Sequence, residues 1–298
     1  MKHWIQAARL RTLPLSLSGI IVGSFYAMSQ NFFDWKILLL AFTTTLGFQI
    51  LSNFANDYGD GVKGTDNEDR IGPKRALQSG TISREAMKNA IILTTILSLL
   101  SAILLIDVAF GNQNFVYSIS YLFLGIGAII AAIKYTVGSN AYGYSGFGDI
   151  FVFIFFGLVS TLGVYFLYAK QFDYVLFLPA IAIGLLAVGV LNLNNMRDEK
   201  SDRKAGKNTI VVKIGWIFAK IYQYFLVISA MILVLVFAIL KDFKVSQYLF
   251  LFAYIPLIKH LKVVYDTINP INFDPELKKV ALATFFLSIL LAIALTVF

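Results

Sequence analysis

The sequence contains no cysteine, and its two histidines stand far apart, at positions 3 and 260. The absence of cysteine excludes disulfide bonds, thiolate-bound zinc and catalysis by a thiol. Two distant histidines are too few for a metal centre built from imidazoles. Charged residues make up only 14% of the chain, compared with roughly 25% in ordinary soluble domains. Any metal site in this chain must therefore use oxygen ligands.

Long apolar runs dominate the 298-residue chain, of which 58% is hydrophobic. Most of these runs approach the ~20 residues that cross ~30 Å of hydrocarbon as a helix. Nine apolar windows follow one another, at 13–28, 37–55, 90–110, 115–132, 150–168, 174–193, 221–240, 247–258 and 280–298. The window at 247–258 is short and must extend toward Val264 to span a bilayer. No small-residue cleavage signal follows the first run, so we expect it to be a retained span. The pattern predicts an all-α integral membrane protein, with residues 1–298 forming a single domain of nine transmembrane helices.

The net charge of +8 is distributed unevenly about the predicted helices. Of the 25 Lys and Arg residues, 21 lie on the side of the N-terminus. The other four are Lys36, Lys170, Lys241 and Lys244. An excess of Lys and Arg in short loops marks the cytoplasmic side of a membrane protein. We therefore expect a cytoplasmic N-terminus and an external C-terminus, and the positive charge indicates membrane topology and not nucleic-acid binding.

A first polar motif, residues 53–66, ends the apolar run 37–54. Ionisable side chains at such a position are costly and usually functional. If the helix continues to Asp60, then Asn53, Asn56, Asp57 and Asp60 fall on one face, because they are separated by three and four residues. Oxygen ligands of this kind suit Mg²⁺, which commonly takes phosphate oxygens as its remaining ligands. This stretch therefore predicts a magnesium and phosphate site.

A second polar motif, residues 192–209, ends the apolar run 175–191. Asn195, Asp198 and Asp202 again share one helical face. Nearby basic side chains can bind phosphate; they are Arg197, Arg203, Lys204 and Lys207. If the bundle brings the second and sixth predicted helices together, the two sets of carboxylates lie close in space. Their equivalent positions indicate a repeat of helical units.

Several other residues have two readings. Lys74 and Arg75 are either ordinary cytoplasmic charges or further anion ligands. Asp149 begins the fifth predicted helix, where it is either a helix N-cap or part of a substrate site. Tyr142 and Tyr144 are either interfacial residues or walls of a pocket for an aromatic substrate. Arg9 and Arg11 are expected to anchor the first helix at the interface, the alternative being a contact with substrate.

Two acidic motifs with basic neighbours at a membrane surface indicate Mg²⁺ and a diphosphate. A long isoprenyl diphosphate satisfies both environments, because its head binds metal and its tail lies between helices. The metal neutralises the charge that builds on the leaving diphosphate. Loss of diphosphate leaves an allylic cation, which requires shielding from water and is captured by an electron-rich aromatic acceptor.

These motifs resemble those of the UbiA superfamily of intramembrane prenyltransferases, whose first motif reads N-D-x-x-D-x-x-x-D. Asn56, Asp57 and Asp60 match it, whereas Gly64 replaces the last acid and Asp66 follows two residues later. With this change the pattern is similar to the first motif of the menaquinone branch of the family, N-D-Y-x-D-x-x-x-G-x-D. The second motif, 194–209, resembles the N-N-x-R-D-x-x-x-D and G-K-x-T of the same branch. Residues 142–157 and 11–14 are also similar to that branch.

The resemblance implies a nine-helix UbiA-type bundle that opens laterally to lipid. It implies Mg²⁺-dependent transfer of a polyprenyl group from polyprenyl diphosphate to 1,4-dihydroxy-2-naphthoate, with loss of CO₂, giving demethylmenaquinone. It also implies a multi-pass protein of the cytoplasmic (inner) membrane of a bacterium, with its active site facing the cytoplasm and no obligatory protein partner. The resemblance implies that Asp57 and Asp60 bind one Mg²⁺ and that Asp198 and Asp202 bind another. The residues that would support the metal and the diphosphate are Asn53, Asn56, Asp66 and Asn195. Diphosphate contacts would come from Lys63, Arg197 and Lys207, and the acceptor would lie nearer to Lys134 and Asp149.

Alternatives remain open at this stage. A prenyltransferase of the same type could use another acceptor, such as 4-hydroxybenzoate, haem or chlorophyllide. A membrane phosphatidyltransferase would carry D-G-x-x-A-R, and no Ala-Arg follows Asp60 and Gly61. A secondary transporter would place its ion sites near the middle of the bilayer. Both motifs instead lie at the cytoplasmic ends of helices, beside basic loops, which favours an enzyme acting on a diphosphate.

Overall fold

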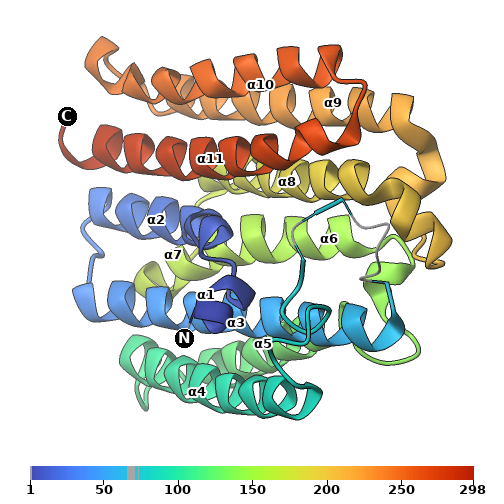
Figure 1. Ribbon diagram of the computed structural model, residues 1–298. Coiled ribbons are helices and arrows are strands. Elements are labelled where there is room, and N and C mark those ends of the chain that lie inside the picture. Colours follow the sequence, from blue (N-terminus) through green and yellow to red (C-terminus); the bar gives the residue numbers. More distant parts are fainter. Residues whose placement is uncertain (1, 66–70, 73) are drawn as a thin grey trace.

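The computed structural model describes residues 2–65, 71–72 and 74–298, and these ranges contain helices but no strand. The long helices run roughly parallel to one another in stacked rows (Figure 1). The predicted all-α class is confirmed. The long elements are α2 (Leu13–Ser29), α3 (Trp35–Lys63), α4 (Arg84–Phe110), α5 (Phe115–Lys134), the continuous stretch α6 (Gly148–Val152), η3 (Phe153–Gly163) and α7 (Val164–Ala169), then α8 (Phe177–Lys204), α9 (Ile210–Leu240), α10 (Tyr254–Asp266) and α11 (Phe273–Thr296).

Shorter helical elements connect or precede these long helices. They are α1 (Lys2–Ala7), η1 (Leu10–Thr12), η2 (Tyr142–Tyr144), η4 (Tyr174–Leu176), η5 (Val245–Ala253) and η6 (Pro270–Asn272). Within the described part of the chain, 8 helical stretches are long and apolar enough to cross a membrane. A further apolar helix, α2, has 17 residues and is slightly shorter than these. The protein is thus a multi-pass membrane protein by length and composition, whereas the count of nine spans and the cytoplasmic N-terminus stay predictions.

Several helices continue beyond the apolar windows that predicted them. α3 runs past residue 55 to Lys63 and ends at Gly64, which adopts the left-handed backbone (φ 72°) that favours glycine at a helix end. α8 continues beyond residue 193 to Lys204. α9 begins at Ile210, where the Thr209 side chain caps it, and bends at Gly215. Hydropathy detects only the lipid-embedded part of a helix, so these polar extensions carry the two acidic motifs on helical turns.

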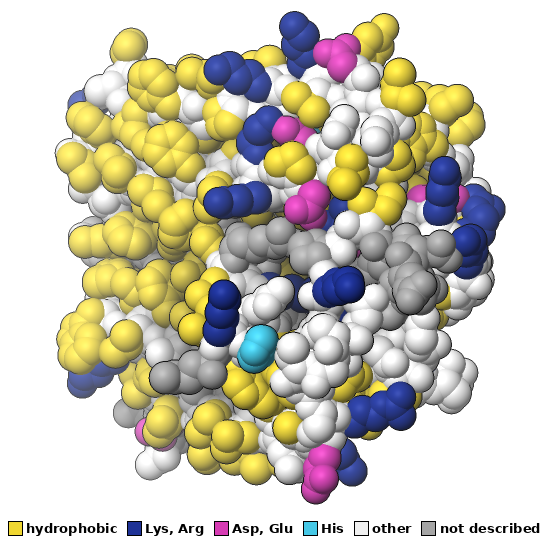
Figure 2. All heavy atoms as spheres, viewed as in Figure 1, with side chains coloured by type: hydrophobic (Ala, Val, Ile, Leu, Met, Phe, Trp, Pro, Cys, Tyr) yellow, Lys and Arg dark blue, Asp and Glu magenta, His cyan; other side chains and the backbone are white. Residues whose placement is uncertain are grey.

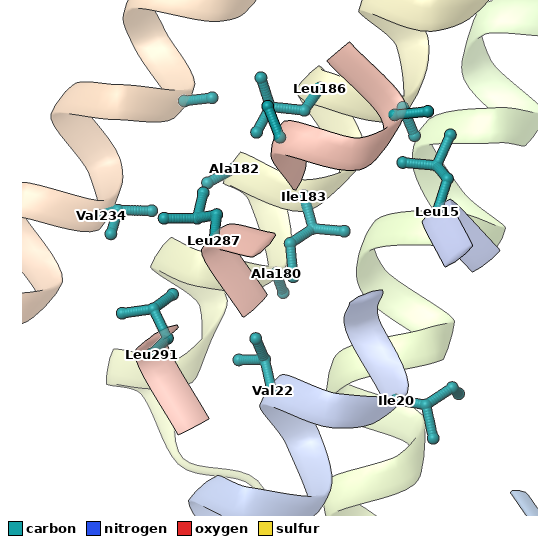
Figure 3. Packing of buried hydrophobic residues seen from close by; sticks show 14 of the residues in the cluster. Leu15, Ile20, Val22, Ala180, Ala182, Ile183, Leu186, Val234, Leu287 and Leu291 are labelled. Carbon is teal, nitrogen blue, oxygen red and sulfur yellow. The ribbon is translucent and has the colours of Figure 1, made fainter. Parts of the chain in front are cut away.

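The apolar core lies where α2, α8, α9 and α11 meet (Figure 3). Lipid tails are as apolar as Leu, so close backbone packing contributes strongly to helix association in a membrane. One such close approach is between η3, a π-helix, and α8. A Cβ added at Gly157 would lie 2.6 Å from the Cα of Gly184 and 2.7 Å from the carbonyl oxygen of Ala180. Glycine at position 157 therefore permits the contact that seats η3 against α8.

The ends of α3 and α8 that carry the acidic motifs lie on the same side of the bundle, and the C-terminus lies on the opposite side (Figure 1). On the face shown in Figure 2, hydrophobic side chains cover most of the left part, and Lys and Arg side chains are more frequent toward the side where α3 and α8 end. The fold thus brings two polar helix ends, remote in sequence, to one basic end of the bundle.

Candidate active site

A cavity of about 380 Å³ lies between α2, α3, α4, α5, the α6–η3–α7 stretch and α8. One end is polar and the other is apolar. The polar end is lined by Arg9, Asn53, Asn56, Asp60, Thr65, Arg75, Asn194, Arg197, Asp198, Ser201, Asp202 and Lys207, and the apolar end by Ala41, Leu105, Ile106, Tyr121, Gly163, Val164 and Leu167. Along α3 the lining extends from Asp60 to Ala41, which is about 28 Å at the α-helical rise. The cavity is therefore nearly as deep as the hydrocarbon core of a bilayer is thick.

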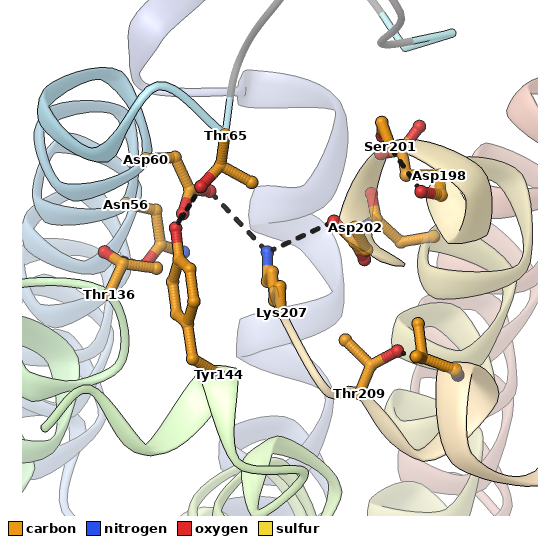
Figure 4. A network of polar contacts seen from close by, with 12 residues as sticks. Asn56, Asp60, Thr65, Thr136, Tyr144, Asp198, Ser201, Asp202, Lys207 and Thr209 are labelled. Carbon is orange, nitrogen blue, oxygen red and sulfur yellow. Dashed lines mark hydrogen bonds and ion pairs between the residues drawn. The ribbon is translucent and has the colours of Figure 1, made fainter. Parts of the chain in front are cut away.

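The Lys207 ammonium lies between the two acidic motifs (Figure 4). Its Nζ is 3.7 Å from Oδ2 of Asp60 on α3 and 3.8 Å from Oδ1 of Asp202 on α8. The loop after α8 folds back to place it there, because the Lys207 N–H donates to the carbonyl of Asp202 at 2.8 Å. Burial alone would lower the pKa of Lys207, but the neighbouring carboxylates raise its pKa above the ordinary value. A permanent cation thus joins the ends of α3 and α8.

Tyr144 supports the α3 side of this site. Its hydroxyl donates to Oδ1 of Asp60 at 2.8 Å and also hydrogen-bonds the Thr65 hydroxyl. The Lys63 ammonium lies 3.8 Å from the centre of the Tyr144 ring, in cation–π contact. Burial raises the pKa of Tyr144, so its hydroxyl keeps the proton that it donates. The sequence left Tyr144 either at the membrane interface or in a pocket wall, and its Tyr-Gly-Tyr motif was the available signal for this position.

Arg197 organises the second motif and is 2% exposed. Its Nε donates to one oxygen of Asp198 at 2.9 Å, and its Nη2 donates to the other at 2.6 Å. The same guanidinium binds Asn194 at 2.9 Å and Asp274 of α11 at 2.6 Å. Arg197 therefore fixes the orientation of Asp198 and ties α8 to α11. Sequence reasoning did not identify Asp274, because the last helices carry no motif.

Asp57 faces a different direction from Asp60. It is buried, and its carboxylate accepts the backbone N–H groups of Ala76 at 3.2 Å and Leu77 at 3.4 Å. It is not among the residues that line the cavity, whereas Asn53, Asn56 and Asp60 are. Asp57 thus sits on the flank of the polar face of α3 and holds the turn that follows the first motif.

The asparagines of the two motifs are placed differently. Asn53 lines the cavity and donates to the carbonyl of Ala8 at 2.9 Å. Asn56 lines it and accepts a 3.4 Å hydrogen bond from Thr136. Asn195 is buried outside the lining, which its neighbour Asn194 joins instead.

Three other predicted residues lie away from the polar end of the cavity or outside the described part of the chain. Lys134 is exposed at the end of α5, outside the cavity lining. Asp149 is buried in the first turn of α6 and hydrogen-bonds the side chain of Tyr222, also outside the lining. Asp66 belongs to the segment outside the described residues.

A hydrogen-bonded chain of buried side chains lies behind α8. The Asn192 Nδ2 donates to the carbonyl of Ala219 at 3.0 Å and to Oε1 of Gln223 at 2.9 Å. The Gln223 Nε2 meets Nε2 of His260 at 3.1 Å, and Nδ1 of His260 meets Glu276 at 2.7 Å. The carbonyl of Ala219 can only accept, which identifies its Asn192 partner as the amide nitrogen. That nitrogen also donates to Gln223, so the Gln223 oxygen accepts and its nitrogen donates to Nε2 of His260. The His260 ring must then carry its proton on Nδ1 and donate it to Glu276.

The donor set at the polar end is suited to a hard cation. Among the described residues, no group of three or more acidic or histidine side chains converges as a preformed metal centre. Mg²⁺, however, is usually held by one or two carboxylates together with water and phosphate oxygens. Asp60 stands on one side of the polar end, and Asp198 and Asp202 stand on the other. Each side thus offers the one or two carboxylates that Mg²⁺ commonly takes, and a diphosphate between them would supply further oxygen ligands.

Comparison with known proteins agrees with the fold and with the motifs. The sequence matches the UbiA prenyltransferase family over residues 16–290. It is 42% identical over 300 residues to a 1,4-dihydroxy-2-naphthoate octaprenyltransferase of Haemophilus influenzae, covering 100% of this chain and 96% of that protein. It is 44% identical over 276 residues to the protein of the same name from Escherichia coli, covering 93% and 89%.

A solved structure also has this fold. It is a UbiA homolog from Archaeoglobus fulgidus bound to DMAPP and Mg²⁺, with a TM-score of 0.66, 17% identity and coverage of 99% of both chains. At that identity the likeness shows the fold alone, and it confirms the predicted UbiA-type bundle. With the family matched over most of its length and relatives above 40% identity, this chain belongs to the UbiA prenyltransferase family.

Proposed function

We propose that this protein transfers a polyprenyl group from polyprenyl diphosphate to 1,4-dihydroxy-2-naphthoate, with loss of CO₂, giving demethylmenaquinone. One observation carries the proposal: two acidic helix ends face each other across Lys207 at the polar end of a deep apolar cavity. That arrangement suits a substrate with an anionic head and a long apolar tail. The names of the two relatives support the choice of acceptor. The DMAPP and Mg²⁺ bound to the structural neighbour support the choice of donor and metal.

The polar end would hold the diphosphate and Mg²⁺. Asp60 would bind one ion, and Asp198 and Asp202 another; Asp57 would join the first only by releasing the amides of Ala76 and Leu77. When bound, the metal neutralises the charge on the leaving diphosphate. Lys207 would pair with a diphosphate oxygen as it now pairs with the two carboxylates. Arg197 keeps both oxygens of Asp198 oriented, and Asn53 and Asn56 would hydrogen-bond the head group from α3.

The apolar part of the cavity would protect the reacting carbon. The bond between the first prenyl carbon and the diphosphate oxygen breaks, its electron pair leaves on diphosphate, and that carbon joins a carbon of the naphthoate ring. The ring loses its carboxylate as CO₂, and the immediate product is the hydroquinone form of demethylmenaquinone, because no oxidant takes part. Aromatic side chains of the lining, among them Tyr135, Phe151 and Phe155, can face a developing allylic cation with their π-electrons. The surrounding apolar wall excludes water, which would otherwise capture that cation.

The cellular setting belongs to the same proposal. The excess of Lys and Arg beside the acidic motifs supports a cytoplasmic active site in the inner membrane of a bacterium. Residues 1–298 would act as a single transmembrane domain that needs no protein partner. A lipid-soluble donor would then enter from the bilayer and a water-soluble acceptor from the cytoplasm.

The proposal is tested by incubating membranes that carry the protein with labelled octaprenyl diphosphate, 1,4-dihydroxy-2-naphthoate and Mg²⁺. We expect a lipid-soluble prenylated product from the wild type. Asp60→Asn and Asp198→Asn should reduce its rate of formation at least a hundredfold. Asp107→Asn is the matched control and should keep wild-type activity. Asp107 is an exposed carboxylate in the last turn of α4, outside the cavity lining.

Three results would change the proposal. Turnover with 4-hydroxybenzoate but not with the naphthoate would keep the chemistry and replace the acceptor. Full activity in a metal chelator would remove Mg²⁺ from the mechanism. Absence of product with every acceptor, from folded protein, would reject prenyl transfer altogether.

A further inference from the structure

At the apolar end of the cavity, Tyr121 of α5 packs within a group of aromatic side chains from α4, α5 and α7. The Tyr121 ring lies 5.0 Å from Phe110, edge to face, and 6.0 Å from Phe166, stacked, between ring centres. Tyr117 packs behind it, 5.1 Å from Phe166 and 5.7 Å from Phe110. Of these four rings, Tyr121 lines the cavity and the other three do not. Tyr121 is thus the inner surface of an aromatic wall.

A hydrogen bond fixes the position of the Tyr121 ring. Its hydroxyl donates to the carbonyl of Gly163 at 2.7 Å. Gly163 is the last residue of the π-helix η3, on the other side of the cavity from α5. π-helical segments are rare and occur frequently at functional sites. A hydroxyl bonded at this point holds the ring across the end of the cavity, because a buried O–H that loses its acceptor is costly.

Tyr121 lies at a depth that a prenyl chain of intermediate length would reach. On α5 it is fourteen residues from Tyr135, the C-cap residue that lines the cavity toward its polar end, which is about 21 Å along the axis. A donor with two isoprene units is too short to reach that depth, whereas longer donors would meet the ring. The residues that share this end of the cavity, Leu105, Ile106 and Leu167, come from other helices and are aliphatic.

We propose that Tyr121 is a specificity-determining residue that ends the prenyl-binding part of the cavity and sets the preferred length of the donor chain. The inference rests on the proposed function and adds the residue that contacts the end of the prenyl chain. Removing the ring takes away a contact for chains that end against it and opens space for chains that extend beyond it. Both effects shift the preference toward longer donors.

The test compares the purified protein in lipid nanodiscs with donors of two, four and eight isoprene units and one fixed acceptor. In Tyr121→Ala we expect the ratio of kcat/KM for eight units to that for four units to rise about tenfold, since small changes in an apolar pocket discriminate by roughly 10–200-fold. Tyr121→Phe keeps the ring and should change that ratio less than threefold. Tyr117→Ala is the matched control, because it removes a ring of the same wall that does not line the cavity, and it should leave the ratio unchanged. The two-unit donor should react at wild-type efficiency in all three variants.

The outcomes separate this inference from the proposed function. No turnover of any donor by the wild type would reject the proposed function. Wild-type turnover with an unchanged ratio in Tyr121→Ala would reject the role of Tyr121 and would indicate that the tail leaves the cavity before reaching it. Should Tyr121→Ala fail to fold, Tyr121→Leu keeps apolar packing and should raise the same ratio by a smaller factor. An unchanged ratio in that variant would overturn the inference equally.

Discussion

Replacing Lys207 by Met should destabilise the metal-free protein more than any change at an exposed lysine. Each carboxylate lies 3.7–3.8 Å from the ammonium, which corresponds to roughly 4 kcal/mol of attraction per pair at an effective dielectric constant near 20. The cost of burying the charges offsets much of this attraction. Breaking a buried ion pair by removing one partner typically costs about 3–5 kcal/mol, so we expect the unfolding temperature to fall by about 10 °C.

The measurement is thermal unfolding of purified protein in a chelating buffer, followed by intrinsic fluorescence. Lys213→Met is the control, because that ammonium donates to the carbonyl of Ser145 at an exposed site and not to buried carboxylates. The sign of the pH dependence follows from the raised pKa of Lys207. A group whose pKa is raised on folding contributes its full stabilisation of the folded state at any pH below its unfolded pKa. The difference in unfolding temperature between Lys207→Met and wild type should therefore be constant from about pH 6 to about pH 9.

Mg²⁺ provides the second half of this test. In Lys207→Met the ammonium between Asp60 and Asp202 is removed, so added Mg²⁺ should raise the unfolding temperature by more than it does in the wild type. Equal unfolding temperatures of Lys207→Met and Lys213→Met in the chelating buffer would refute the reasoning. Such a result would mean that the ammonium does not neutralise Asp60 and Asp202.

Two further predictions concern packing and orientation. Gly157→Ala should lower the stability by about 1–3 kcal/mol, because the new Cβ would meet the backbone of Gly184 and Ala180; Gly127→Ala, whose Cβ meets nothing within 4 Å, should leave thermal unfolding unchanged or slightly improved. Arg197→Lys should reduce prenyl transfer at least tenfold, since an ammonium cannot reproduce the two-pronged contact with Asp198. Arg203→Lys, at an exposed pair with Glu199, should retain activity within a factor of two, and equal losses in both arginine variants would contradict a specific role for Arg197.

The sequence was sufficient to predict which stretches are helical and which helix ends line the polar part of the cavity. The spacing of Asn53, Asn56 and Asp60 placed them on one face, and they do line the cavity together. It could not predict that Asp57 turns toward residues 76–77, because helical periodicity fixes angles around one helix and not the position of its neighbours. The contact between Arg197 and Asp274 joins residues 77 positions apart, and nothing in the local sequence marks it. The π-helix also leaves no compositional signal, since its residues are ordinary for a membrane span.

The buried chain from Ala219 through Asn192, Gln223 and His260 to Glu276 limits how α8 can move. Asn192 and Asp198 are six residues apart, so their side chains point in directions about 120° apart around the helix axis. The side of α8 that carries Asn192 is therefore attached to α9 and α10, and through His260 to α11, by bonds that each have a single direction. Turning α8 about its axis would break several of these bonds at once. Asp198 and Asp202 thus belong to the half of the bundle that these bonds hold in place, and we expect any widening that admits a lipid substrate to come from α3, α4 and α5, which pack mainly on one another.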